Sequence, residues 1–398
     1  MSVSRRAFVR NLTVRAAAPS ATFIAARGRE AWVGEHGSDD QAAQAPDANA
    51  QAAVRLSSNE NPLGPSAVAI EAIERAFAYS GRYPMNAKPA MVDFRTLIAT
   101  RNGLKVENVL LGAGSGEILD TAVRAFTGPS NGLVSALPTF ESPARVAKSL
   151  KVRLDEVPVD DAGRLDLEKM AAAATGAGLV FVCNPNNPTG AVRSADDITA
   201  MVTRISQASP QTVILLDEAY HEYVTDSSYA TAVPLVSKFP NVIVSRTLSK
   251  AHGMAGLRLG YAIGNAEVIS KLGRWTMPYN ANAPVVAAGV VSVQDEAQLA
   301  REQRRNTEAL KFTTDFFRTA GFKTSDSQAN FIWINLGRPA REFGDACEKQ
   351  GIQVGRPFPP FEKTHCRISI GTMEEMQRAV GVFRSVLGLT TPTAGGRY

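Results

Sequence analysis

The sequence predicts an α/β fold with a mostly parallel central sheet and a smaller α+β domain. A chain of 398 residues that is 44% hydrophobic is long enough to bury the cores of two domains. Short apolar runs bounded by glycine or proline are typical of strands buried on both faces, and they recur at residues 109–111, 132–137, 178–183, 212–217 and 241–246. Helical patterns separate these runs, and strands that alternate with helices indicate a parallel sheet.

The N-terminal 30 residues carry the net charge of the chain. They contain six of its 43 basic residues and one of its 38 acidic residues, which accounts for the whole formal charge of +5. The rest of the chain is electrically balanced, so nothing in it indicates a nucleic-acid partner.

Residues 1–30 also resemble an export signal. The segment SRRAFVR (Ser4–Arg10) is similar to the twin-arginine consensus, and an alanine-rich, mildly apolar stretch follows it. We therefore expect a periplasmic protein; the alternative is a disordered basic tail on a cytoplasmic protein. No later apolar run reaches the length of a membrane span, and residues 31–53, which lack an apolar period, are predicted to be a linker.

The remaining chain is expected to form two domains. Residues 54–85 are predicted to be an N-terminal arm and part of the small domain, and residues 86–290 the large domain. Beyond about residue 290 the pattern changes to a long polar helix (294–320) and then to short apolar runs. A capping box formed by Thr372 and Glu375 begins the last helix, so residues 291–398 are predicted to complete the small domain.

The cysteines and histidines do not indicate a disulfide or a metal site. Cys183, Cys347 and Cys366 are scattered and lack the C-x-x-C spacing, and the four histidines form no ligand cluster. A structural role is the simpler interpretation for each of them, and we expect no metal.

A glycine-rich turn follows the first strand. Ligands of open α/β sheets bind beyond the carboxyl ends of the strands, and here GAGSGE (112–117) opens a helix. Free backbone N–H groups and the helix dipole favour a phosphate at such a position. A dinucleotide site would also need an acidic residue at the end of the next strand. That strand is predicted at 132–137, and no acidic residue follows it before Glu141. The turn therefore indicates a phosphate group and argues against a dinucleotide.

Three further strand ends carry polar residues of unlike chemistry. NPNNPTG (184–190) follows the third strand, Asp217 and Tyr220 follow the fourth, and Lys250 follows the fifth. Pyridoxal 5′-phosphate needs such a set: a lysine for its aldehyde, a carboxylate that keeps its pyridine nitrogen protonated, and donors for its phosphate. We therefore expect this cofactor.

From about Val54 to Leu387 the chain resembles the fold-type I aminotransferases of class I and II, and among them most of all the histidinol-phosphate aminotransferases. The resemblance implies that family's fold, with pyridoxal 5′-phosphate as cofactor and a homodimer as the assembly. It lies in motifs that occur in the family's order: SSNENPLGP (57–65), RYP (82–84), VLLGAGSGE (109–117), LPTFE (137–141), NPNNPTG (184–190), DEAY (217–220), RTLSKAHGMAGLRLGY (246–261), NFIWI (330–334) and RISIG (367–371).

The resemblance also implies roles for the residues around the cofactor. Lys250, Asp217 and Tyr220 would be catalytic: Lys250 would bind the aldehyde and move a proton at the substrate Cα, and Asp217 would pair with the pyridine nitrogen. Asn187 and Tyr220 would hydrogen-bond the ring oxygen, and Phe140 would stack on the ring. A further set would hold the phosphate: Ser115, Gly116, Thr247, Ser249, Arg258 and, from a partner subunit, Tyr83.

The substrate residues implied by the resemblance favour transamination. Arg367 would grip the α-carboxylate as a planar fork, and Arg356, Asn187 and Asn330 would be further substrate contacts. A carboxylate held in this way leaves the Cα–H bond facing the lysine. We therefore expect transfer of an amino group from an L-amino acid or a histidinol-phosphate-like donor to a 2-oxo acid such as 2-oxoglutarate. A decarboxylase or lyase similar to threonine-phosphate decarboxylase is the alternative.

Two positions depart from the pattern of the histidinol-phosphate aminotransferases. Leu63 stands where that family often has a tyrosine that contacts the substrate phosphate, and residues 351–361 hold one residue more than the usual turn. Assigning Arg356 to the distal substrate group therefore requires a shift in register. Both departures weigh against histidinol phosphate itself as the donor.

Overall fold

The computed structural model describes residues 53–389, which belong to one compact unit. The predicted signal (1–30) and all but the last residue of the predicted linker (31–53) lie outside the described residues. Between residues 53 and 389 no helix is both long enough and apolar enough to span a bilayer.

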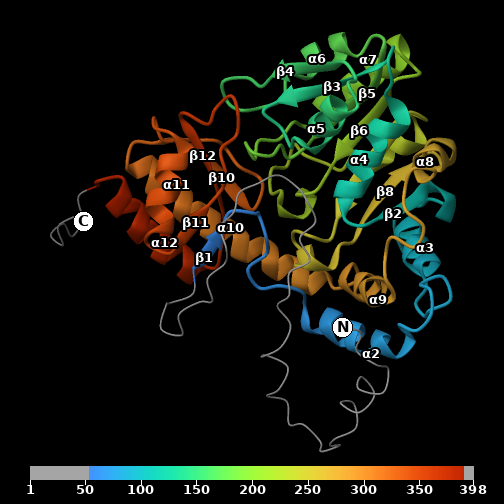
Figure 1. The fold of residues 1–398 in the computed structure, drawn as a ribbon, viewed down its shortest axis with the longest axis horizontal. Helices are drawn as coiled ribbons and strands as arrows, with labels where there is room; N and C mark the ends of the chain where they lie inside the picture. Colours follow the sequence, from blue (N-terminus) through green and yellow to red (C-terminus); the bar gives the residue numbers. More distant parts are fainter. Residues whose placement is uncertain (1–52, 390–398) are drawn as a thin grey trace, which may run out of the picture. The chain divides into compact units, whose positions relative to one another are not determined.

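A seven-stranded sheet forms the centre of the fold, with the strand order β2-β8-β7-β6-β5-β3-β4 (Figure 1). The strands are β2 (Val109–Gly112), β3 (Gly132–Leu137), β4 (Leu154–Pro158), β5 (Ala177–Cys183), β6 (Val213–Asp217), β7 (Val242–Thr247) and β8 (Gly260–Gly264). Strand β8 runs antiparallel to β2 and β7, and every other adjacent pair is parallel. The predicted α/β fold with a mostly parallel sheet is confirmed.

Helices cover both faces of this sheet. The helices of this region are α2 (Ala67–Ala76), α3 (Met91–Arg101), α4 (Ser115–Phe126), α5 (Ser142–Ser149), α6 (Leu167–Ala173), α7 (Ala195–Ala208), α8 (Ala266–Gly273) and α9 (Ala283–Ser292). In β5, Val180 and Val182 join a core with α3, α6, α7 and α9, whereas Leu179 and Phe181 join another with α4, α5 and α8. Because neighbouring residues of a strand point to opposite faces, a strand covered on both sides must be apolar throughout.

A second group of elements surrounds a separate core. Its strands are β1 (Val54–Leu56), β9 (Lys323–Thr324), β10 (Phe331–Asn335), β11 (Ile352–Val354) and β12 (His365–Ser369), and its helices are α10 (Glu296–Thr319), α11 (Ala340–Glu348) and α12 (Met373–Val386). Strands β12, β10 and β9 form an antiparallel sheet, and β1 pairs in parallel with β11. Val54 and Leu56 are buried with residues of β10, β12 and α12, so the start of the described chain packs with its end. The boundaries proposed at 85/86 and 290/291 stay predictions.

The structure agrees with the helix start that Thr372 and Glu375 indicate, and it adds two strands, β4 and β8, to those predicted for the central sheet. The hydroxyl of Thr372 accepts from the N–H of Glu375, and the Glu375 carboxylate accepts from the N–H of Thr372, which is a capping box at the start of α12. Strand β4 (LDEVP) is an edge strand with charged residues, and β8 (GYAIG) is a short strand between two glycines. Neither has a short apolar run of the kind by which the other strands of the central sheet were predicted.

Candidate active site

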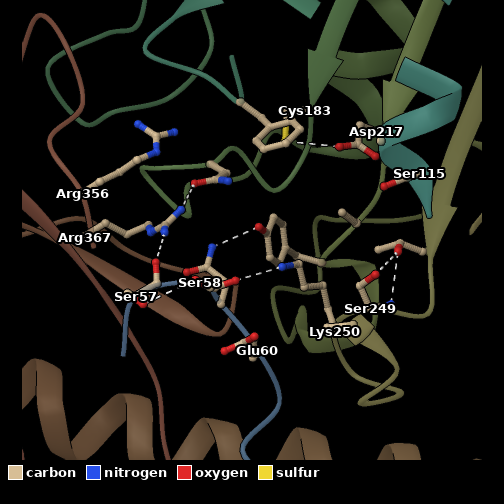
Figure 2. Close-up of a pocket in the computed structure, with 18 of the residues that line it drawn as sticks. Ser57, Ser58, Glu60, Ser115, Cys183, Asp217, Ser249, Lys250, Arg356 and Arg367 are labelled. Carbon is tan, nitrogen blue, oxygen red and sulfur yellow. Dashed lines mark hydrogen bonds between the residues drawn. The ribbon is translucent and has the colours of Figure 1, made fainter. Parts of the chain in front are cut away.

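The carboxyl ends of β5, β6 and β7 border a cavity of about 590 Å³ (Figure 2). Segments from distant parts of the sequence meet there, including the N-terminal segment before α2, the first turn of α4 and the loop after β7. The lining residues are Ser57, Ser58, Asn59, Glu60, Ser115, Gly116, Phe140, Cys183, Asn187, Asp217, Ala219, Tyr220, Thr247, Ser249, Lys250, Ala255, Arg258, Val354, Arg356 and Arg367. Twelve of the fourteen predicted site residues are therefore in one place, and Asn330 and Tyr83 are not among them.

Lys250 projects into this cavity from the loop that follows β7. Its Nζ donates to the carbonyl oxygen of Ser58 at 3.2 Å and lies 5.7 Å from the centre of the Tyr220 ring. Burial, and after it the positive charge of Arg367, lower the pKa of Lys250 to about 8, and Arg258 acts in the same direction. Burial is the largest of these causes, and the charge of Arg258 is a smaller one. A lysine with this pKa is partly neutral near pH 8, and the neutral amine is the nucleophilic form.

Asp217, the last residue of β6, presents a buried carboxylate that is 2% exposed. Ser245 stands opposite it on β7, and the Ser245 hydroxyl donates to Oδ1 at 2.7 Å. Its other oxygen, Oδ2, lies 3.9 Å from the sulfur of Cys183, a weak donor. Burial raises the pKa of Asp217 to about 6. The carboxylate therefore faces the cavity without a strong partner at Oδ2.

Tyr220 and Arg367 are held by the N-terminal segment. The side-chain amide of Asn59 donates to the Tyr220 hydroxyl at 3.0 Å, and a guanidinium nitrogen of Arg367 donates to the carbonyl of Ser57. Another nitrogen of Arg367 donates to Oδ1 of Asn187 at 2.9 Å. Its Nε is buried and has no partner among the described residues. Burial lowers the pKa of Arg367 to about 10, so it remains a cation at neutral pH.

The first turn of α4 and the loop after β7 form a cup suited to an anion. The Thr247 hydroxyl lies 2.9 Å from that of Ser249, and Arg258 donates to the Ser249 hydroxyl at 3.2 Å. Arg258 also donates to the carbonyl of Ala113, directly before Gly114. Gly114 has a φ of +76°, and a Cβ there would lie 2.2 Å from an Arg258 nitrogen. Only glycine therefore allows the guanidinium to lie against this turn, beside the free N–H groups of α4.

Two predicted site residues lie elsewhere. Asn330 is fully buried, and its amide donates to the carbonyl of Asn59 at 3.0 Å. Because the prediction took Asn330 as a direct substrate contact, the correction is that in this structure its side chain supports the N-terminal segment and does not line the cavity. Tyr83 is 67% exposed and stacks on Tyr279 at a centroid distance of 4.8 Å, also outside the lining.

The remaining predicted residues line the cavity, together with several that the sequence did not single out. Phe140 lies in the wall, and Arg356 forms an ion pair with Glu141 and stacks on Phe358. The unpredicted residues are Ser57, Ser58, Asn59, Glu60, Cys183, Ala219, Ala255 and Val354. The family motif SSNENPLGP contains the first four, so the motif itself was the signal for them. Cys183 carried no such signal, because its contact with Asp217 depends on the order of the strands.

The donor set of this cavity fits pyridoxal 5′-phosphate. The carboxylate of Asp217 can accept a hydrogen bond from a protonated pyridine nitrogen at Oδ2, and the amine of Lys250 can take the aldehyde carbon. The hydroxyls of Thr247 and Ser249, the guanidinium of Arg258 and the first turn of α4 can hold the phosphate. In the described part of the chain no cluster of three or more His, Cys, Asp or Glu residues could hold a metal ion. The fold and the site together define a fold-type I enzyme that depends on pyridoxal phosphate.

Comparisons with known proteins place the chain in one family. The family model for aminotransferase class I and II matches residues 52–383, and the chain belongs to this family. It is 36% identical over 338 residues to the histidinol-phosphate aminotransferase of Symbiobacterium thermophilum, and the match covers 84% of this chain and 91% of the relative. It is 33% identical over 335 residues to the Bacillus subtilis enzyme of the same name, with 84% and 91% covered.

A solved structure supports the cofactor. The histidinol-phosphate aminotransferase from Sinorhizobium meliloti in complex with pyridoxal 5′-phosphate is similar with a TM-score of 0.77 and 26% identity, and the match covers 85% of this chain and 91% of that one. The protein is a pyridoxal-phosphate-dependent aminotransferase, as predicted.

Proposed function

We propose that the aminotransferase uses this one cavity in turn for an L-amino acid or histidinol-phosphate-like donor and for a 2-oxo acid acceptor such as 2-oxoglutarate. The observation that carries the proposal is that Lys250, Asp217 and Arg367 line the same cavity. These residues supply a base, a partner for the cofactor ring and a fork for a carboxylate. An enzyme that exchanges an amino group between two acids needs all three around one bound cofactor, with the base at the substrate Cα, the fork at its carboxylate and the third residue at the ring nitrogen.

Each of these residues has a task that its surroundings allow. When bound, the cofactor supplies an electron sink for the carbanion at the substrate Cα. Lys250 Nζ, whose pKa lies near 8, takes the Cα proton in its neutral form and returns it later. Asp217 keeps its negative charge beside the ring nitrogen. Asn187 and Tyr220 hydrogen-bond the ring oxygen. Arg367 orients the α-carboxylate through nitrogens that include the unpartnered Nε.

The position of Arg367 favours transamination over decarboxylation. A carboxylate paired with a buried guanidinium is hydrogen-bonded and stabilised, so loss of carbon dioxide is resisted while the Cα–H bond remains free to react. The L-threonine-O-3-phosphate decarboxylase from Porphyromonas gingivalis has the same fold but is 20% identical, so this likeness concerns the fold alone. A decarboxylase would release carbon dioxide without needing an acceptor, and the two functions are separated by that measurement.

The distal part of the cavity bears on the choice of donor. Arg356, proposed to contact the distal substrate group, is paired with Glu141, and Leu63 is largely exposed. A donor with a phosphate would have to compete with Glu141 for Arg356, so we keep L-amino acids and histidinol-phosphate-like donors as the proposed class. The test is a panel of amino donors mixed with the purified enzyme without acceptor, followed by cofactor absorbance. If no donor converts the cofactor to its amine form, the proposal fails.

Replacing Arg367 with alanine is expected to lower kcat/KM for every donor and acceptor by about 10²-fold or more, because a buried charge pair with the α-carboxylate is lost. The loss should be shared by substrates with very different side chains, since all of them carry the α-carboxylate. Arg356→Ala is the matched control on the same side of the cavity, and its effect should depend on the distal group. A loss at Arg367 that varies strongly with the side chain would contradict the assignment.

We also propose that the enzyme acts as a homodimer in which Tyr83 reaches the phosphate site of the partner subunit. The support is that Phe77, Tyr83 and Tyr279 border one hollow of the surface, where they are 64%, 67% and 45% exposed. Apolar surfaces of this kind commonly mark interfaces. Sedimentation should give a dimer. Tyr83→Phe should weaken the retention of the cofactor but should leave the dimer intact. A monomer that keeps full activity would rule the proposal out.

Export by the twin-arginine route is proposed for residues 1–30, on the sequence pattern alone. Changing Arg5 and Arg6 together to lysine should retain a fused reporter in the cytoplasm, whereas the same change at Arg27 and Arg29 should not. A reporter that stays in the cytoplasm with the unchanged segment as well would indicate a basic tail and a cytoplasmic enzyme.

A further inference from the structure

A second carboxylate, Glu218, directly follows Asp217 but does not line the cavity. The side chain of Glu218 is 4% exposed and forms an ion pair with Arg246, whose side chain is 13% exposed. The Nε and one terminal nitrogen of Arg246 donate to Oε2 of Glu218 at 3.0 and 2.8 Å. The same carboxylate accepts from the Thr231 hydroxyl and from the N–H of Ala232 at 2.6 Å.

The register of two parallel strands separates the two carboxylates. Asp217 pairs with Ser245 across β6 and β7, and the N–H of Glu218 donates to the carbonyl of Ser245 at 2.9 Å. Because successive side chains along a strand point to opposite faces, Asp217 and Ser245 lie together toward the cavity. Glu218 and Arg246, the next residue on each strand, lie together on the other side. The pair therefore ties the ends of β6 and β7 behind the cofactor site.

We propose that Arg246 is a positioning residue for the cofactor: by neutralising Glu218 and joining the ends of β6 and β7, it keeps Asp217 ionised and seated against Ser245 for the pyridine nitrogen. Arg246 itself touches neither substrate nor cofactor in this scheme. Its action passes through Glu218 and the strand ends.

The charges around Asp217 explain why such a residue is needed. Asp217 is buried, and burial together with the charge of Glu218 raises its pKa, whereas the hydrogen bond from Ser245, the charge of Lys250 and the contact with Cys183 lower it. A buried carboxylate next to another is costly unless a cation compensates it. Without Arg246, Glu218 would be uncompensated, and the pKa of Asp217 would rise toward neutral pH.

The experiment compares cofactor binding to the full chain in three variants: Arg246→Met, Glu218→Gln and the double variant. The dissociation constant for pyridoxal 5′-phosphate is measured by absorbance between pH 5 and 8.5. Binding needs the carboxylate form of Asp217, so it weakens as the pH falls through the pKa of that group. Arg246→Met should shift this loss to higher pH and weaken binding about fivefold at pH 6, since a rise of one unit in a pKa of about 6 lowers the carboxylate fraction there from about a half to about a tenth.

Glu218→Gln should shift the loss of cofactor binding to lower pH, because Arg246 is then an unpaired cation near Asp217. In the double variant neither charge remains, and the affinity should return to within about threefold of the wild-type value. A role limited to packing would weaken binding in both single variants and further in the double variant. That pattern would overturn the proposal. If Arg246→Met does not fold, Glu218→Gln alone still decides, because only the charge mechanism predicts binding that persists to lower pH.

A cofactor analogue and a matched variant complete the design. An analogue with a C–H group in place of the ring nitrogen cannot pair with Asp217, so its affinity should be the same within about threefold in wild type and Arg246→Met. Equal weakening of analogue and cofactor would contradict the proposal. Thr231→Val removes the hydroxyl that donates to Glu218 and accepts from Arg246, but it removes no charge. The pH at which binding is lost should therefore stay the same. The inference rests on the cofactor site: failure of the wild type to bind the cofactor would refute the site, whereas normal wild-type binding with unshifted variants would refute only the role of Arg246.

Discussion

Replacing Lys250 with alanine is expected to abolish turnover, with a loss of kcat of at least ~10⁴-fold. The variant lacks both the amine that takes the cofactor aldehyde and the base that moves the proton at the substrate Cα. Because one residue has both roles, its loss removes two steps of the reaction at once. No second lysine lines the cavity. Turnover is measured with a donor and 2-oxoglutarate, and the attachment point by borohydride reduction and mass analysis of the peptide that contains residue 250.

The pH dependence of cofactor capture provides an independent check on Lys250. Its pKa is lowered to about 8, and the neutral amine is the reactive form, so the rate of capture by the full chain should rise as the pH increases through 8 and then level off. A lysine with its usual pKa near 10.4 would give a rate that still rises above pH 9. Lys271→Ala is the control, because Lys271 lies on the surface in an ion pair with Glu267. Near-normal turnover by Lys250→Ala would end the assignment.

The sequence predicted most of the central sheet because strands that are buried on both faces are continuous apolar runs. Strands β5 and β6 are apolar in every position except the last residues, which belong to the site. Strand β4 was missed because an edge strand needs only one buried face and can carry Asp155 and Glu156. Strand β8 was missed because it is short and its first two residues, Gly260 and Tyr261, belong to the motif 246–261, which was interpreted through the roles of Lys250 and Arg258. Its antiparallel direction follows from a connection that no local pattern reveals.

The site was predictable to the extent that its residues stand at strand ends or in family motifs. Lys250, Asp217 and Asn187 each follow an apolar run, and parallel strands bring such ends to one edge of the sheet. Contacts across long sequence separations were not predictable in this way. Asn59 holds the Tyr220 hydroxyl, and Arg367 holds Asn187, and both contacts join segments whose proximity only the fold determines. The position of Asn330 was not predictable for the same reason. Its motif indicated the site, but its side-chain amide donates to the carbonyl of Asn59, which is distant in the sequence.

Replacing Asp217 with asparagine is expected to lower kcat by on the order of 10²–10³-fold while cofactor can still enter the cavity. An amide has nearly the same size as the carboxylate, but it carries no charge to stabilise a protonated ring nitrogen, and removal of one such electrostatic partner typically costs that much. Oδ2 is the atom concerned, because Oδ1 already accepts from Ser245. Asp217→Glu retains the charge but displaces it, so its loss of kcat should be smaller.

Two neighbours of Asp217 separate the effect of charge from that of shape. Ser245→Ala removes the hydrogen bond to Oδ1 and leaves the charge, so it should raise the pKa of Asp217 and cost about 10-fold or less. Cys183→Ser, next to Oδ2, replaces a weak donor with a stronger one and should move the pKa in the opposite direction. The rate of each half-reaction, measured by stopped-flow absorbance, should rank Asp217→Asn far below Ser245→Ala. If the two variants were equally slow, the buried carboxylate would be acting as a hydrogen-bonding group and its negative charge would not be what the reaction requires.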